Sequence, residues 1–313
     1  MASFRDQAVW ITGASAGLGA EMARQFAAQG ARLVLSARRA DRLAEIVLEC
    51  EALGGSARAL PLDVTNDADV AAAARSIAEC EGRLDVAIAN AGFGVTGAFA
   101  KLTTDDWRRQ FEVNLMGVVN VARESLALLG QSGSASVSAN DSEEQVRSGG
   151  ASAARGKSSD ASSDNQVAPH LPTAKPHTRG RLVLISSVAA FMPGPGVAPY
   201  SASKAAVRSL VQSLALELLA TGISVTGIYP GFVESEIRQV DNDGQYDPDN
   251  PDRGPHKLYW PTDRAARVML RAIHKRKREF VFTAHGQLGA WLGRHAPWLL
   301  HALFQRGSQR KRD

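Results

Sequence analysis

Short apolar runs and longer amphipathic stretches alternate along almost the whole chain. The apolar runs have the length of buried strands and lie near residues 7–12, 32–37, 57–62, 84–89, 181–187, 223–229 and 279–283. Between them, apolar residues recur every three or four positions, as in helices, near residues 17–29, 41–53, 67–80, 104–129, 199–221 and 262–275. This alternation predicts an α/β fold: a single doubly wound parallel sheet of about seven strands, with helices on both faces. Such a sheet binds ligands at the carboxyl ends of its strands.

The segment 131–178 interrupts this alternation. It contains eleven serines, no aromatic residue and four residues of valine, isoleucine or leucine, so it can bury too little apolar surface to offset the entropy of ordering. We expect it to be disordered. It leaves the carboxyl end of one helix and enters the amino end of the next strand, which places it on the sheet edge opposite the ligand crevice. It is therefore interpreted as a surface insertion, with a partner-binding or phosphorylated role left open.

The tail, residues 286–313, is longer than seven strands require. Five apolar residues fall close to one helical face despite a kink expected at Pro297, namely Leu288, Trp291, Leu292, Leu299 and Leu303. Basic residues follow this stripe. An amphipathic basic stripe can pack on the core, on a second subunit of a homo-oligomer, or at a membrane interface. Burial against protein is the more common outcome, and the two tryptophans keep peripheral membrane contact open.

The composition is typical of a water-soluble enzyme. With 313 residues and 44% apolar content the chain can bury a large core. The net charge of +4 does not indicate nucleic-acid binding, because the basic clusters lie at element ends, where solvated charge is common. Only Cys50 and Cys80 are present, which favours a reducing compartment over a disulfide framework. No signal peptide or run of eighteen apolar residues is found, so we expect a cytoplasmic protein.

Glycines follow the first predicted strand at a spacing suited to phosphate binding. Gly13, Gly17 and Gly19 separate that strand from a helix, and the helix N-terminus would present free N–H groups and a partial positive charge to a pyrophosphate. Residues 8–35 thus predict a dinucleotide-binding βαβ unit. We expect residues 1–285 to form one dinucleotide-binding and catalytic domain, interrupted by the insertion.

A tyrosine and a lysine stand four residues apart on the predicted helix 199–221. Tyr200 and Lys204 therefore share one helical face, where the lysine ammonium can stabilise the tyrosine phenolate. That arrangement would turn an ordinary tyrosine into an acid–base catalyst. Ser187 lies thirteen residues upstream, at the end of a predicted strand.

Taken together, these motifs resemble those of the short-chain dehydrogenase/reductase family, over residues from about 5 to about 285 apart from the insertion. Beyond the three glycines, the positions that match the family are Asp63, the turn Asn90-Ala91-Gly92, the set Asn114, Ser187, Tyr200 and Lys204, and the turn Pro230-Gly231. The resemblance implies nicotinamide cofactor contacts at Gly13, Ser15, Gly17, Leu18, Gly19, Arg38, Arg39, Asp63, Val64, Asn90, Ala91, Gly92, Tyr200, Lys204, Pro230, Gly231, Val233 and Ser235.

The resemblance also implies a role for each member of the catalytic set. Ser187 would donate a hydrogen bond to the substrate oxygen, and Tyr200 would exchange a proton with that oxygen as hydride moves to or from the nicotinamide. Lys204 would assist Tyr200 and bind the nicotinamide ribose. Asn114 would hold a water that connects Lys204 to solvent; the alternative is a helix residue bonded to its own backbone.

The end of the second predicted strand bears on the choice of cofactor. Ala37 stands where an NAD-preferring enzyme places a carboxylate, and Arg38 follows it. A guanidinium can bind a 2′-phosphate in a bidentate fork, so NADP is favoured and NAD is the alternative. Against this, Ala16 stands where many NADP-using relatives carry a basic residue, and Arg38 and Arg39 could simply begin a solvated turn.

The substrate region should follow Pro230-Gly231. Residues 236–261 contain five aspartates together with Pro248, Pro251 and Pro255, which predicts a mobile acidic flap and no metal site. The apolar residues expected to face the substrate are Phe93, Val95, Val188, Phe191, Met192, Leu258, Tyr259 and Trp260. They indicate an apolar carbonyl or alcohol. The alternative function is a non-catalytic NADP(H)-binding regulatory protein on the same fold.

Overall fold

A computed structural model describes residues 4–131, 180–250, 252 and 254–309. Seven parallel strands form one sheet in the order β3-β2-β1-β4-β5-β6-β7. The strands are β1 (Ala8–Thr12), β2 (Arg32–Ser36), β3 (Ser56–Ala59), β4 (Val86–Ala89), β5 (Arg181–Ile185), β6 (Ser224–Tyr229) and β7 (Glu279–Val281). The strand order reverses between β1 and β4, which creates a crevice at their carboxyl ends. The predicted fold class is confirmed.

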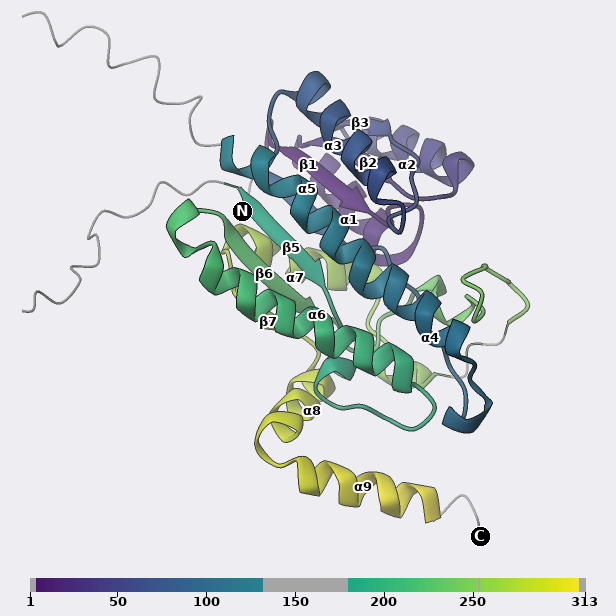
Figure 1. Ribbon diagram of the computed structural model, residues 1–313. Coiled ribbons are helices and arrows are strands. Elements are labelled where there is room, and N and C mark those ends of the chain that lie inside the picture. Colours follow the sequence, from purple (N-terminus) through teal and green to yellow (C-terminus); the bar gives the residue numbers. More distant parts are fainter. Residues whose placement is uncertain (1–3, 132–179, 251, 253, 310–313) are drawn as a thin grey trace, which may run out of the picture.

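Helices cover both faces of the sheet (Figure 1). On one face lie α1 (Gly17–Ala27), α2 (Ala40–Ala52) and α7 (Thr262–His274), and on the other lie α3 (Asp67–Glu81), α5 (Gly117–Gln131) and α6 (Ala198–Glu217). Each face of the sheet has its own hydrophobic core: the first lies under α1, α2 and α7, and the second under α3, α5 and α6. Successive side chains of a strand point to opposite faces, so Val9 and Ile11 enter the first core while Trp10 enters the second. Because both faces are covered, β1 is buried along its whole length.

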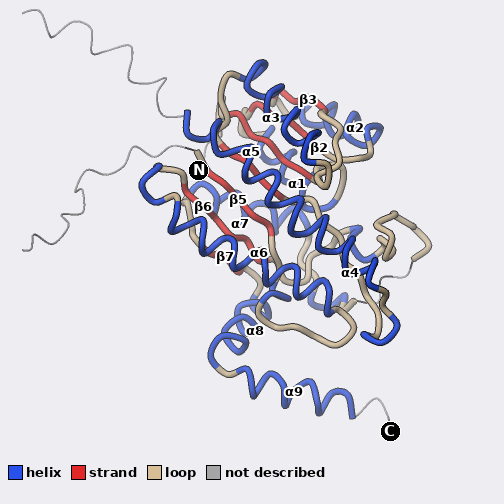
Figure 2. Tube along the Cα trace, in the orientation of Figure 1, coloured by secondary structure: helices blue, strands red, loops and turns tan. Residues whose placement is uncertain are grey.

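The predicted helix 104–129 is broken in the middle. It consists of α4 (Thr104–Phe111), a π-helical turn (Glu112–Met116) and α5. Figure 2 shows the path of α4 and α5, with helices in blue. The periodic apolar pattern continues through the turn, which explains why the pattern predicts one helix. The turn contains Asn114, whose side chain is fully buried. A π-helical turn inserts one extra residue into a helix and is frequent at functional sites.

The tail begins with a helix that packs on the sheet. Helix α8 (Ala284–His295) begins before the predicted boundary at 285/286, and α9 (Pro297–Gln309) follows at the expected break. Gly289 lies against the Met192 sulfur and Gly293 against the Phe191 carbonyl, so a side chain at either glycine would collide. Figure 1 shows α9 outside the body of the sheet and its flanking helices. None of the helices described is long and apolar enough to cross a membrane.

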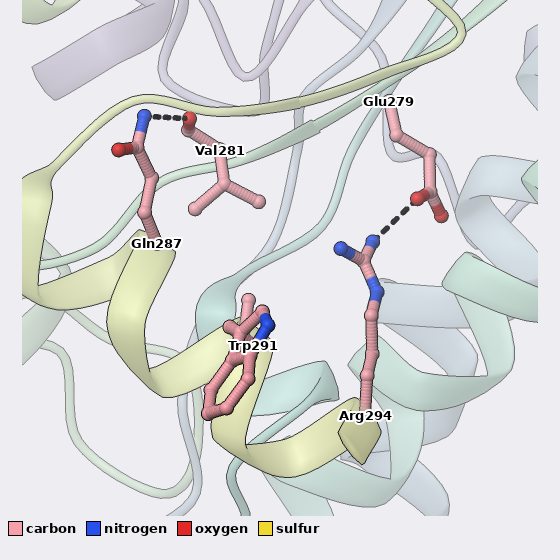
Figure 3. Close-up of a pocket in the computed structure, with 6 residues that line it drawn as sticks. Glu279, Val281, Gln287, Trp291 and Arg294 are labelled. Atoms are coloured by element: carbon pink, nitrogen blue, oxygen red, sulfur yellow. Dashed lines mark hydrogen bonds and ion pairs between the residues drawn. The ribbon is translucent and has the colours of Figure 1, made fainter.

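The predicted apolar stripe of the tail is only partly covered. Leu292 is buried, whereas Leu288, Trp291 and Trp298 are 60%, 56% and 72% exposed. A hollow of about 360 Å³ lies between β7 and α8, with Trp291 among the residues that line it. Figure 3 shows Trp291 in this hollow and Arg294 paired to Glu279. Contact of the tail with a second subunit or a membrane stays a prediction.

The insertion lies outside the described residues except at its edges. The preceding helix, α5, ends at Gln131, and the structure describes the chain again from Gly180. The Gly180 N–H donates to the Leu129 carbonyl at 3.1 Å. Arg181 then donates its N–H to the Asp85 carbonyl at 2.8 Å, next to the start of β4. The two edges of the insertion therefore meet at the amino-terminal edge of the sheet.

Candidate active site

The glycine turn after β1 packs directly on the turn after β4. Gly13 has φ +66°, and a Cβ on it would lie 2.8 Å from the Cα of Ala91. A Cβ on Gly19 would collide with the Gly13 carbonyl oxygen. Both positions therefore require glycine.

Asn90 fastens these two turns together. Its Nδ2 donates to the carbonyls of Thr12 at 3.0 Å and Gly13 at 3.1 Å. The Thr12 hydroxyl donates to the Ile88 carbonyl and accepts the Asn90 N–H at 3.2 Å. Thr12 was not among the predicted site residues, although its hydroxyl joins the end of β1 to the turn after β4.

The start of α1 fits a bound pyrophosphate. The N-cap, Ala16, offers no side-chain acceptor, and the first turn of α1 contains no acidic residue, so the free N–H groups of that turn are not capped by a side chain of the helix start. Gly17 has φ +52°, and a Cβ there would meet only the Ser235 side chain within reach, at 3.3 Å. Leu18 packs against the core beneath the turn. This arrangement suits the phosphates of a dinucleotide.

Lys204 reaches from α6 into the crevice, and its side chain is almost wholly buried. Its Nζ donates to the Ile185 carbonyl at the end of β5 at 3.1 Å and lies 5.9 Å from the centre of the Tyr200 ring. Burial lowers the pKa of Lys204 to about 8. Ser186 ties α6 to the sheet, because its hydroxyl donates to the Lys204 carbonyl at 2.8 Å.

Asn114 and Lys204 converge on Gly92. A Cβ at Gly92 would lie 2.9 Å from the Asn114 Oδ1 and 3.4 Å from the Lys204 Nζ, so both groups occupy the space beside this glycine. The Asn114 amide also accepts the Phe93 N–H and donates to the Phe93 carbonyl, both at 3.0 Å, and its Nδ2 lies 3.3 Å from the Ser203 hydroxyl. Asn114 thus bonds another segment rather than its own backbone.

Ser187 lies where β5 turns into a short 3₁₀ helix (Val188–Ala190). Its hydroxyl accepts the Ala189 N–H at 3.1 Å and is largely buried. The next residue, Val188, donates its N–H to the Pro230 carbonyl at 3.0 Å. The end of β5 therefore lies beside the Pro230-Gly231 turn after β6.

The turn after β6 is fixed by the start of α8. The Thr283 hydroxyl and the His285 ring fill the space beside Gly231, so no side chain fits there. The His285 Nε2 accepts the Phe232 N–H at 3.2 Å, which fixes the neutral ring, and burial lowers the pKa of His285. Val233 is buried and pairs with Trp260, and Ser235 stands against Gly17.

The two arginines after β2 engage the region predicted to be a flap. Arg38 donates to the Gly244 carbonyl at 2.7 Å, and Arg39 bonds the Ser15 hydroxyl at 3.2 Å and the Glu236 carboxylate at 3.1 Å. The aspartates of this region cap its own turns: Asp241 accepts the N–H groups of Asp243 and Gln245, and Asp247 that of Asp249. In the described part of the chain, no acidic, histidine or cysteine residues gather as a metal site would require.

Asp63 and Val64 follow β3 beside the end of β2, because Leu62 donates its N–H to the Ala37 carbonyl at 3.1 Å. Asp63 accepts bonds from the N–H and the hydroxyl of Thr65, and Val64 is buried in the second core with its carbonyl bonded to Asn120.

Gly94 lies beside the Tyr200 ring, and three of the apolar residues predicted to face the substrate make other contacts. Gly94 faces the Tyr200 ring, since a Cβ there would lie 3.6 Å from it. Val95 is fully buried, with its N–H bonded to Gln110, and Leu258 is 43% exposed. Phe191 packs at 4.9 Å from the buried Tyr229 ring and between two guanidinium groups. These three residues serve packing or face solvent.

Ser186, Ser203, Gln110 and Thr12 support the site and were missed by sequence reasoning. Three of them bond main-chain atoms far away in the sequence: Ser186 to Lys204, Gln110 to Phe93 and Val95, and Thr12 to Ile88. Such contacts have no spacing signal. Ser203 bonds Asn114 and the Tyr200 carbonyl, and its place between Tyr200 and Lys204 was the one usable clue.

Comparison with known proteins identifies the family. The model of the family described as "short chain dehydrogenase" matches residues 7–146 and 164–245, which is more than half of the chain. This chain belongs to the short-chain dehydrogenase family. The match skips residues 147–163, inside the insertion. The chain is therefore an oxidoreductase of that family that uses a nicotinamide cofactor.

Curated relatives agree with this assignment. An uncharacterized oxidoreductase of Myxococcus xanthus is 31% identical over 77% of this chain and 78% of its own length. The human dehydrogenase/reductase SDR family member 7 is 27% identical over 85% of this short-chain dehydrogenase and 66% of its own length.

Two solved structures share the fold at lower identity. A Burkholderia phymatum short chain dehydrogenase/reductase in complex with NAD has a TM-score of 0.66 and 24% identity, covering 89% of both chains. A Thermococcus sibiricus alcohol dehydrogenase complexed with 5-hydroxy-NADP has a TM-score of 0.65 and 22% identity, covering 90% of this chain and 98% of that one.

Proposed function

We propose that this short-chain dehydrogenase is an NADP-dependent oxidoreductase that interconverts an apolar carbonyl compound and its alcohol. The observation that carries the proposal is the buried Lys204 ammonium one helical turn from Tyr200, at the same sheet edge as the glycine turn and the uncapped start of α1. A buried cation beside a phenol favours the phenolate and makes the phenol an effective proton donor and acceptor.

The chain's own residues divide the acid–base work. When bound, the nicotinamide supplies or accepts the hydride. The Ser187 hydroxyl donates a hydrogen bond to the substrate oxygen, and the Tyr200 phenol gives that oxygen its proton in reduction and removes it in oxidation. Lys204 stabilises the phenolate and binds the cofactor ribose. Asn114, beside Lys204 at Gly92, holds the water through which the proton is replaced.

The preference for NADP rests on the end of β2. Ala37 leaves no carboxylate to repel a 2′-phosphate, while Arg38 and Arg39 both bring guanidinium groups to the crevice. The two solved structures above carry different cofactors, so membership of the fold does not decide between NAD and NADP. Gly94 beside Tyr200, with buried Phe93 next to it, supports an apolar substrate.

Tyr200→Phe tests the catalytic assignment. It removes the proton donor alone, so we expect turnover to fall by about a hundredfold or more while the Kd for NADPH changes less than about twofold. The assay is NADPH oxidation over a panel of aldehydes and ketones of increasing apolar size. Tyr229→Phe, which removes the hydroxyl of a tyrosine that lies beside Glu279 and away from the glycine turn and Lys204, is the control.

The same experiment separates the alternative function. If the wild type binds NADPH tightly and reduces no member of the panel, a cofactor-sensing regulatory protein replaces the enzyme. If Tyr200→Phe keeps near-normal turnover on a good substrate, Tyr200 is not the acid.

Two cysteines without a disulfide, Cys50 buried and Cys80 exposed, support action in the reducing cytoplasm.

A further inference from the structure

A strap of the chain, defined as residues 236–247, lies between the two sides of the crevice. On the cofactor side, Arg38 bonds its Gly244 carbonyl and Arg39 its Glu236 carboxylate. On the other side, the Asn242 amide exchanges two hydrogen bonds of 3.0 Å with the main chain of Thr96. The strap is thus anchored on both sides.

The anchor at Arg39 occupies an anion-binding position. The Arg39 guanidinium bonds the Ser15 hydroxyl in the glycine turn and the Glu236 carboxylate, and it lies 5.6 Å from the centre of the Tyr246 ring. The carboxylate of Glu236 is only about a third exposed, as is Arg39. Arg39 therefore already has an anionic partner, at the end of β2 where a 2′-phosphate would have to bind.

We propose that Glu236 is a specificity-determining residue: its carboxylate competes with the 2′-phosphate of NADP for Arg39 and narrows the preference for NADPH over NADH. The inference rests on the proposed function, which assigns the phosphate to Arg38 and Arg39. A 2′-phosphate brings about two negative charges to the guanidinium. It must either displace Glu236 or lie beside it, and both arrangements penalise NADPH. NADH lacks the phosphate, so the Glu236–Arg39 pair persists when it binds.

The position of Glu236 distinguishes it from the other acidic residue nearby. Glu234, two residues earlier, is exposed, and the described contacts include no ion pair of its side chain. Glu234 and Glu236 carry the same charge and lie two residues apart in the chain. Removing the charge at 234 therefore controls for a general change in the potential around the crevice.

The test measures cofactor binding without substrate or turnover. Kd values for NADPH and NADH are determined by fluorescence titration for the wild type, Glu236→Gln and Glu234→Gln. We expect Glu236→Gln to lower the Kd for NADPH about fivefold and to change the Kd for NADH by less than about twofold. Most of the effect on the Kd for NADPH should disappear at 0.5 M salt. Glu234→Gln should leave both values unchanged.

A pair of cofactor fragments separates charge competition from a structural role. The fragment 2′,5′-ADP carries the 2′-phosphate and 5′-AMP does not, so Glu236→Gln should tighten only the former. Equal changes for both fragments, or weaker NADPH binding by Glu236→Gln, would show that Glu236 positions the strap or Arg39, and the proposal would be wrong. If the wild type binds neither NADPH nor NADH, it is the proposed function that fails. If Arg38→Asp leaves the NADPH preference intact, the phosphate site lies elsewhere.

Discussion

Lys204 carries the charge on which the proposed chemistry depends, and the fold buries it. Burial lowers its pKa from 10.5 to about 8. When the folded-state pKa of a lysine lies below the unfolded value, the unfolded state binds more protons between these two pH values, so stability rises with pH there. Below about pH 8 the buried charge therefore costs the fold up to about 3 kcal/mol, at about 1.4 kcal/mol per pKa unit.

Lys204→Met should therefore stabilise the cofactor-free protein while abolishing turnover. We expect a gain of up to about 3 kcal/mol in the free energy of unfolding at pH 7, shrinking towards zero as the pH rises from 8 to above 10. Urea denaturation at pH 7 and pH 9.5 measures it.

The control for this prediction is Lys275→Met. Lys275 is exposed, so its substitution should change neither stability nor the pH dependence of stability by more than about 0.5 kcal/mol. A destabilised Lys204→Met protein at pH 7 would contradict the prediction. It would mean that the Ile185 carbonyl and the Tyr200 ring stabilise the ammonium by more than burial costs it.

Sequence reasoning reaches some residues of the candidate site and not others, for a physical reason. Tyr200 and Lys204 share a helical face, and helix geometry turns their spacing into proximity. The Ser186 contact with the Lys204 carbonyl depends on how α6 lies on β5, which no local pattern encodes. The same holds for the Glu236 contact with Arg39, across 197 positions of the chain.

At the scale of elements, a helix was predicted where the chain forms a π-helical turn. The turn Glu112–Met116 directs the Asn114 side chain to Phe93 and Ser203, and all three groups lie in the interior. Asn114→Leu removes these bonds and leaves the Phe93 N–H without its acceptor. We expect a loss of about 2–4 kcal/mol in the free energy of unfolding, measured by chemical denaturation, together with a loss of activity.

Met116→Gln is the matched control, because Met116 belongs to the same turn and is 41% exposed. It should change stability by less than about 0.5 kcal/mol. If Asn114→Leu is as stable as this control, the π-helical turn does not depend on the amide bonds, and its origin lies in the apolar packing of α5.

The boundaries of β3 differ from the sequence expectation. The third strand was expected over 57–62 but ends at Ala59. Leu60 and Leu62 still donate their N–H groups to the carbonyls of Leu35 and Ala37, so the chain stays bonded to β2 beyond the end of the strand. The apolar pattern continues past Ala59, so it predicts a longer strand than the one that forms.

At the scale of the whole molecule, the alternation of strand and helix was enough to predict the sheet and the edge that carries the site. Parallel strands with right-handed crossovers admit few other arrangements. The tail was less predictable. Its stripe of apolar residues suggested one buried face, but Gly289 and Gly293 make the close contacts that seat α8, and Trp291 lies outside them.

The sheet also predicts that the insertion can be removed. Residues 133–176, most of the insertion between α5 and β5, are replaced by a short Gly-Ser linker. Gly180 and Leu129 are already hydrogen-bonded at the amino-terminal edge of the sheet, whereas the site lies at the carboxyl ends of the strands. We expect turnover and KM within about twofold of the wild type and a Tm within about 2 °C, because shortening a loop changes its closure entropy only slightly.

The control for the deletion is a scrambled insertion of the same length and composition, which keeps the charge and the bulk but not the order of residues. Both variants should match the wild type in steady-state kinetics and thermal melting. A KM raised severalfold in the deletion variant, with its Tm intact, would mean that the segment reaches the crevice from the opposite edge. Normal kinetics in the scrambled variant and raised KM in the deletion variant would assign that effect to bulk or charge, and its placement away from the site would then be wrong.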